Sequence, residues 1–134
     1  FAPGAPGPDV ASNRADPPGF ARALAGERTA AGASSARTEG LDDRCDNAGS
    51  LPFQASPEAA EVALQRAGFI PLGRGVGRSD GTREGFWFGQ THDATIRIRP
   101  AQTDVRVAAR EPGPDGGAAC RLLNRIQAEL QTMR

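Results

Sequence analysis

Large apolar side chains are distributed unevenly along this chain, and that distribution limits where a hydrophobic core can form. Residues 51–134 hold about four times as many of them as residues 1–50 do. Within residues 1–50 these side chains are Phe1, Val10, Phe20, Leu24 and Leu41. A segment with so few apolar residues cannot bury enough surface to fold alone. We therefore predict an extended, low-complexity segment over residues 1–50 and one folded domain over residues 51–134.

The N-terminal segment opens with FAPGAPGPDVASNRADPPGF, which is rich in proline and glycine. Both residues favour turns and extended backbone over a helix. One short helical turn around residues 20–25 is compatible with the sequence. A segment of this kind either stays disordered or wraps over another surface.

The folded domain begins with the clearest helix signal in the chain, SPEAAEVALQRAG. Ser56 is a favourable N-cap, Pro57 suits the first helical position, and Gly68 suits a left-handed stop. The apolar positions of this helix are mostly alanine, which predicts close packing against a sheet.

Alternating and helical patterns complete the domain. We predict strands at FIPLG (69–73), GFWFG (85–89), ATIRIRP (94–100) and TDVRVAAR (103–110), with a glycine-rich connection over residues 74–84. The last segment, GGAACRLLNRIQAELQTM, has an apolar stripe at helical spacing. The order predicts a two-layer α+β fold: an antiparallel sheet of about four strands packed against two helices, with a long irregular N-terminal extension.

Charge limits the function classes. The 16 positive and 16 negative residues cancel, so the chain lacks the net positive charge typical of proteins that bind nucleic acid or an anionic membrane. All of the positive residues are arginine, so a P-loop lysine and Schiff-base chemistry are excluded. The chain contains no apolar run long enough for a transmembrane helix.

Two cysteines, Cys45 and Cys120, are spaced unlike a CxxC redox motif or a zinc site. They form either one disulfide or two buried free thiols. A disulfide indicates a periplasmic or otherwise extracytoplasmic protein. The chain begins at Phe1, and we expect that a signal peptide or anchor was removed or that the chain is part of a longer product.

The only histidine precedes an aspartate, as His92-Asp93, in a polar break between two predicted strands. A hairpin turn explains the pair without chemistry. One histidine cannot supply a metal site by itself, and we predict neither metal nor cofactor. The remaining alternative is a hydrolase-like enzyme that uses His92, Asp93 and Cys45 or a serine.

The two arginine-rich strands predict a charged sheet face. With a turn over residues 100–103, Arg97 lies opposite Arg106. Two positive charges in these positions repel each other, so we expect a carboxylate, a bound anion or an acidic partner protein between them. A solvated face with screened charges is the alternative. We take Arg97, Arg106 and Arg110, with Trp87 as a stacking surface, as candidate contacts for an anion or a partner.

Three segments, DPPGFARAL, FWFGQTHDATIRIRP and TDVRVAAREPGPDGGAACRLLNRI, resemble the bacterial domain of unknown function 1499 (DUF1499) over about residues 13–133. Such domains are often carried behind membrane-spanning segments, and no activity is established for them. The positions that match are Asp93, Arg97, Arg106, Arg110, Asp115, Gly117 and Arg121. His92, Val107, Ala109 and Ala119 stand where the family pattern has other polar residues, so the chain resembles a diverged member.

The resemblance implies that Asp115 and Arg121 form a structural polar network at the start of the last helix. It also leaves Cys120 outside the family pattern, which favours a disulfide particular to this protein.

Our leading hypothesis is a non-catalytic, exported accessory protein. It would be a peripheral subunit of a larger, membrane-associated assembly, and would bind protein partners through its N-terminal segment and sheet face. The alternatives are a small-molecule or anion-binding domain that uses the arginine face, and third, the hydrolase-like enzyme.

Overall fold

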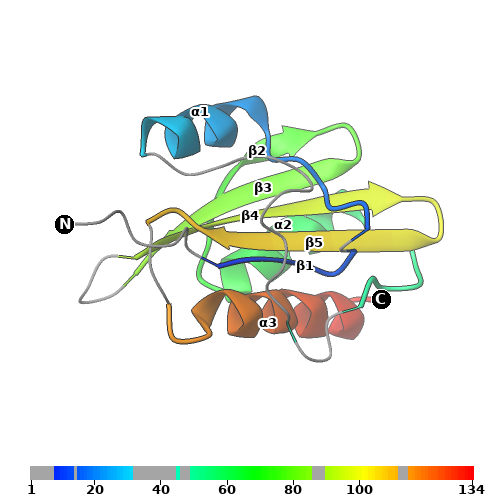
Figure 1. The fold of residues 1–134 in the computed structure, drawn as a ribbon. Coiled ribbons are helices and arrows are strands. Elements are labelled where there is room, and N and C mark those ends of the chain that lie inside the picture. Colours follow the sequence, from blue (N-terminus) through cyan, green and yellow to red (C-terminus); the bar gives the residue numbers. More distant parts are fainter. Residues whose placement is uncertain (1–7, 14, 32–44, 46–48, 86–89, 112–114) are drawn as a thin grey trace.

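The computed structural model of the chain describes residues 8–13, 15–31, 45, 49–85, 90–111 and 115–134. These residues form an antiparallel sheet with the strand order β1-β5-β4-β3-β2 and three helices packed against it (Figure 1). In chain order the elements are β1 (Asp9–Ala11), α1 (Arg22–Ala30), α2 (Pro57–Arg66), β2 (Ile70–Gly75), β3 (Arg78–Glu84), β4 (Thr91–Arg99), β5 (Gln102–Ala109) and α3 (Ala118–Thr132). The predicted α+β class with an antiparallel sheet is confirmed.

Helix α2 begins and ends as its sequence predicts. The hydroxyl of Ser56 accepts a hydrogen bond from the backbone N–H of Ala59 at 3.0 Å, and Pro57 is the first helical residue. After the helix, Gly68 adopts a φ of +91°, a left-handed conformation that glycine enters without strain.

The main core lies between one face of the sheet and the helices α2 and α3. Alternate residues of the central strands, such as Ile96, Val105 and Val107, are fully buried there. The small residues Ala60 and Ala63 allow α2 to approach the strands closely, as predicted. The predicted stripe of α3 also faces this core: Ala119, Leu123, Ile126 and Leu130 are buried, and Leu122 and Met133 are partly buried.

The opposite face of the sheet is covered by residues from the N-terminal segment. A small second cluster joins Phe20 and Leu24 to Ala108 of β5. Figure 1 shows α1 separated from α3 by the sheet. Two described parts of the predicted extension are therefore regular elements of the fold, since β1 pairs with β5 and α1 has nine residues.

Two local predictions were wrong. Residues 78–84 are not a connection but the strand β3, which pairs with both β2 and β4. His92 and Asp93 are not in a turn, because β4 starts at Thr91 and pairs with strands on both sides. The aromatic part of the predicted strand at 85–89 lies outside the described residues.

The predicted register between the two arginine-rich strands was also wrong. The turn consists of Pro100 and Ala101 alone, and Ala101 has a φ of 64°. This shorter turn places Arg97 opposite Asp104, and it places Arg106 opposite Thr95. The expected clash between two arginines is therefore absent, because opposite charges face each other instead.

No helix in the described parts of the chain is long and apolar enough to cross a membrane.

Candidate functional site

Asp104 is the centre of a charged cluster at one end of the covered face. Arg97 and Arg99 each donate to its Oδ2 atom at 2.6 Å, and Ser50 and Gln102 donate to Oδ1. Burial alone would raise the pKa of Asp104, but the hydrogen bonds from these four side chains outweigh it and lower the pKa to about 2. The carboxylate is therefore charged at neutral pH.

Asp93 likewise accepts hydrogen bonds from two arginines, at the other end of the covered sheet face. Arg28 of α1 donates to its Oδ2 atom at 3.0 Å, and Arg110 donates to Oδ1 at 2.5 Å. The hydrogen bonds to Asp93 raise the pKa of Arg110. Because Asp93 has no exposed side-chain surface, these contacts join α1 to the sheet through a buried charge.

Arg106 is fully buried between these two clusters. It donates to both carboxylate oxygens of Asp9, with Nε 2.8 Å from Oδ1, and to the backbone oxygen of Pro18. The ring of Phe20 covers the guanidinium at 4.4 Å, and the same ring lies 4.9 Å from that of Arg28. The N-terminal segment thus supplies both the counter-charge and the cover for Arg106.

The structure pairs each of the three arginines predicted as anion or partner contacts with a carboxylate of this chain. Arg97 binds Asp104, Arg106 binds Asp9, and Arg110 binds Asp93. Trp87 lies outside the described residues. The exposed fraction of the side chain is 0% for Arg106 and 16% for Arg110. Their contact with an external anion stays a prediction, and these internal partners already satisfy their charge.

His92 lies on the core face of β4, opposite to Asp93, because neighbouring residues of a strand point to opposite faces. Its Nε2 atom is 2.9 Å from Oδ2 of Asp115, and within the described residues its Nδ1 atom is buried without a hydrogen-bond partner. His92 and Asp93 therefore do not form a catalytic pair with each other.

Asp115 connects the histidine to the start of α3. Its carboxylate accepts hydrogen bonds from the backbone N–H groups of Gly117 and Ala119 at 2.9 and 2.7 Å. Burial alone would raise the pKa of Asp115, but the hydrogen bonds from His92 and the two backbone groups outweigh it, so the pKa is lowered. Arg121 donates to the backbone oxygen of Gly116 at 2.8 Å. Both residues of the predicted polar network thus contact the segment where α3 begins.

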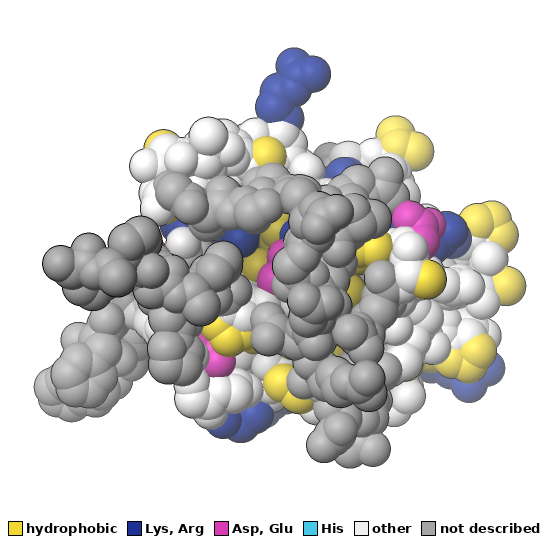
Figure 2. All heavy atoms as spheres, viewed as in Figure 1, with side chains coloured by type: hydrophobic (Ala, Val, Ile, Leu, Met, Phe, Trp, Pro, Cys, Tyr) yellow, Lys and Arg dark blue, Asp and Glu magenta, His cyan; other side chains and the backbone are white. Residues whose placement is uncertain are grey.

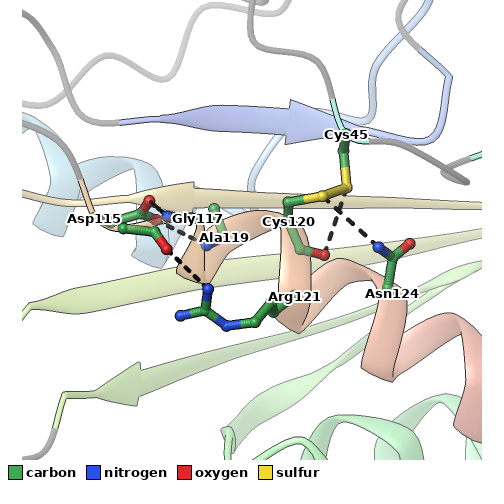
Figure 3. Close-up of a disulfide and its surroundings, with 8 residues drawn as sticks. Cys45, Asp115, Gly117, Ala119, Cys120, Arg121 and Asn124 are labelled. Carbon is green, nitrogen blue, oxygen red and sulfur yellow. Dashed lines mark hydrogen bonds between the residues drawn. A yellow bond between two sulfur atoms is a disulfide. The ribbon is translucent and has the colours of Figure 1, made fainter.

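Cys45 and Cys120 form a disulfide, with Cα atoms 5.2 Å apart (Figure 3). The bond fastens Cys45 to the first turn of α3, beside the Asp115 contacts. The predicted disulfide is confirmed, and Cys45 has no free thiol to act as a nucleophile. Disulfides are typical of proteins that fold in an oxidising, extracytoplasmic compartment.

No family model matches this chain, and the comparisons with curated proteins and with solved structures found no similar protein. Within the ranges that the structure describes, no three His, Cys, Asp or Glu side chains are grouped to hold a metal ion.

The strand β2 is the most unusual part of the molecular surface, because it lies at an edge of the sheet and carries exposed apolar residues. Ile70 and Leu72 are 62% and 47% exposed, and Val76, in the turn after β2, is completely exposed. They are the only large apolar side chains in the described residues with such exposure. Figure 2 shows apolar side chains at the upper right, where Figure 1 places the turn between β2 and β3.

A groove of about 220 Å³ lies beside this edge, between β2 and the start of α1. Its lining includes the apolar side chains of Leu24 and Leu72 and the charged side chains of Arg78 and Asp80. Arg78 donates to both oxygens of Asp80 at 3.0 Å, so these two charges form an ion pair with each other. An apolar side chain from a partner would fit such a groove.

Sequence reasoning missed this edge. The alternation of Ile70 and Leu72 is visible in the sequence, but it is equally typical of a strand whose apolar face packs on a core. Only the strand order places β2 at an edge.

Proposed function

We propose that this protein is a non-catalytic, extracytoplasmic accessory subunit that binds an extended apolar segment of a partner protein along the β2 edge. The observation that carries the proposal is the exposure of Ile70, Leu72 and Val76 at one unpaired edge, next to an open groove. Exposed apolar patches on otherwise polar surfaces are typical of protein interfaces.

The edge limits how a partner can bind. Pro71 has no N–H to donate, and the pairing of β2 with β3 is irregular between Pro71 and Gly73. Such features hinder uncontrolled strand addition. We therefore expect the apolar side chains and the groove to supply most of the contact, and backbone pairing at Gly73–Gly75 to add orientation.

The proposal moves the binding surface away from the N-terminal segment and the sheet face. Residues 9–11 and 22–30 are packed on the chain's own sheet, and the charged face beneath them is internally paired. The proposed setting stays a larger, membrane-associated assembly, with the compartment supported by the disulfide.

We also propose that the polar positions shared with DUF1499 maintain the fold. Asp93, Arg97, Arg106 and Arg110 take part in the buried pairs, and Asp115 holds the start of α3. A role in stability explains why a diverged member would keep them while it loses other polar residues.

The test is gentle detergent extraction from the source organism, followed by sizing of the native protein and of the variants Ile70→Glu and Leu72→Glu. We expect the native protein to migrate with a large assembly and both variants to migrate alone. Gln65→Glu, at an exposed site on α2, is the matched control and should stay associated. Because all three positions are exposed, the variants should retain the native melting temperature.

Two results would contradict the proposal: migration of the native protein as a lone 13.9 kDa chain, or unchanged association of both variants. Sedimentation of the purified protein tests whether it associates with a second copy of itself. If it dimerises and Ile70→Glu prevents this, the edge binds a second copy rather than a different protein.

A further inference from the structure

Four arginines surround a cleft on the core side of the molecule that is separate from the β2 edge. The cleft has a volume of about 500 Å³ and lies between the end of α2, the strand β3 and the first half of α3. Arg66 and Arg83 line one side, and Arg121 and Arg125 line the other. Ala118 and Leu122 add an apolar wall. The volume suits a small organic ligand.

The positive charge of this cleft is only partly balanced. Glu129 accepts from Arg66 at 3.2 Å and from Arg125 at 3.0 Å. Among the residues that the structure describes, no carboxylate lies within ion-pair distance of the guanidinium group of Arg83 or Arg121. Among the described residues, four positive side chains and one negative side chain therefore leave a net positive cleft. On the sheet face, by contrast, every predicted contact arginine has its own aspartate.

The backbone beside Arg83 accommodates its guanidinium. A Cβ atom at Gly68 would lie 2.8 Å from Nε of Arg83, and Gly68 has a φ of +91°. Because glycine lacks this atom, the Arg83 head group can lie directly against the end of α2. A side chain at residue 68 would displace Arg83 from its place in the cleft.

We infer that this cleft binds a phosphoryl group. Guanidinium groups donate hydrogen bonds in a planar fork that matches the oxygens of phosphate, and a phosphoryl dianion would balance the charge left by Arg83 and Arg121. Ala118 and Leu122 would contact carbon atoms in the organic part of the ligand. This site is independent of the docking edge, and either proposal can fail alone.

The first experiment is isothermal titration of the purified protein with glycerol 3-phosphate and with pyrophosphate, against chloride at equal ionic strength. We expect binding of the phosphate compounds only. Arg83→Gln and Arg121→Gln should each weaken binding about tenfold, because each removes a charge-assisted hydrogen bond, and the double variant should abolish it.

Arg22→Gln is the matched control, because Arg22 is an exposed arginine on α1, across the sheet from the cleft. It should bind as tightly as the native protein. Neither Arg83 nor Arg121 has an ion pair to lose within the described residues, so Arg83→Gln should keep the native melting temperature. Arg121→Gln also loses the exposed hydrogen bond to the backbone oxygen of Gly116, so its melting temperature should fall slightly, and its binding is measured well below that temperature.

The second experiment identifies the source of the phosphoryl group by flotation with vesicles of phosphatidylcholine, with and without phosphatidic acid. Flotation that requires phosphatidic acid and is lost in the double variant assigns the cleft to a lipid headgroup. Titration without flotation assigns it to a free phosphate compound. The inference is overturned if neither assay detects binding, if the double variant still binds, or if Arg22→Gln weakens binding equally.

Discussion

Nε of Arg106 lies 2.8 Å from Oδ1 of Asp9, and this contact joins two strands across 97 positions of the chain. Both groups are buried, so each helps to balance the charge of the other. A segment with few apolar residues thus contributes a buried counter-charge to the sheet. Loss of one partner of such a pair is costly, because the other is left buried in a water-poor environment.

We expect Asp9→Ala to lower the free energy of unfolding by about 3 kcal/mol, because it takes the Asp9 carboxylate away from a buried guanidinium. Urea unfolding of the purified protein measures this difference. Asp16→Ala is the control, because Asp16 is half-exposed and lies 3.4 Å from Arg99 at the surface, and it should cost less than about 1 kcal/mol. If both variants lose the same free energy of unfolding, burial does not determine how much an ion pair matters here, and the prediction is wrong.

Asp104 should make the protein sensitive to acid. Its pKa of about 2 in the folded state is below the ordinary value of 3.8. The stability that the charged carboxylate adds to the folded state is therefore complete above about pH 4 and is lost as the pH falls toward 2. A shift of this size corresponds to about 2 kcal/mol of folding free energy. Urea unfolding at about pH 5 and at about pH 2 measures the loss.

The variant Asp104→Asn is the comparison for this prediction. It should be less stable at neutral pH, because Arg97 and Arg99 lose their buried counter-charge and keep only the half-exposed Asp16. Its stability should fall less between about pH 5 and about pH 2, since the group that titrates is gone. A fall as steep as that of the native protein would assign the acid sensitivity to other carboxylates.

Reduction of the disulfide should lower the free energy of unfolding by about 4 kcal/mol in the chain-entropy model, because the bond closes a long loop in the unfolded chain. The two cysteines are 75 positions apart. Urea unfolding with and without a thiol reductant measures the effect. The double variant Cys45→Ser/Cys120→Ser should match the reduced protein and not respond to reductant. If the reductant leaves the free energy of unfolding of the native protein unchanged, this prediction is wrong.

The sequence by itself determined the elements whose signals are local. Ser56, Pro57 and Gly68 bound α2 because capping depends on neighbouring residues alone. The alternation around Ile96 and Val107 indicated core-facing strands, since the period of two follows from the pleat. The α+β class followed from the order of these elements. The cysteine count allowed one disulfide, but it did not exclude two buried thiols.

Only the tertiary structure decided which strands are neighbours and which charges meet. A two-residue turn at Pro100 and Ala101 replaced a longer one, and this shift placed Arg97 opposite Asp104 instead of Arg106. Strand β1 and the cover over Arg106 depend on contacts about a hundred residues apart, which no local pattern encodes. The exposed edge of β2 and the arginine cleft could not be predicted for the same reason. The exposure of a side chain and the net charge around it depend on which elements pack beside it, and the sequence of one strand does not specify its neighbours.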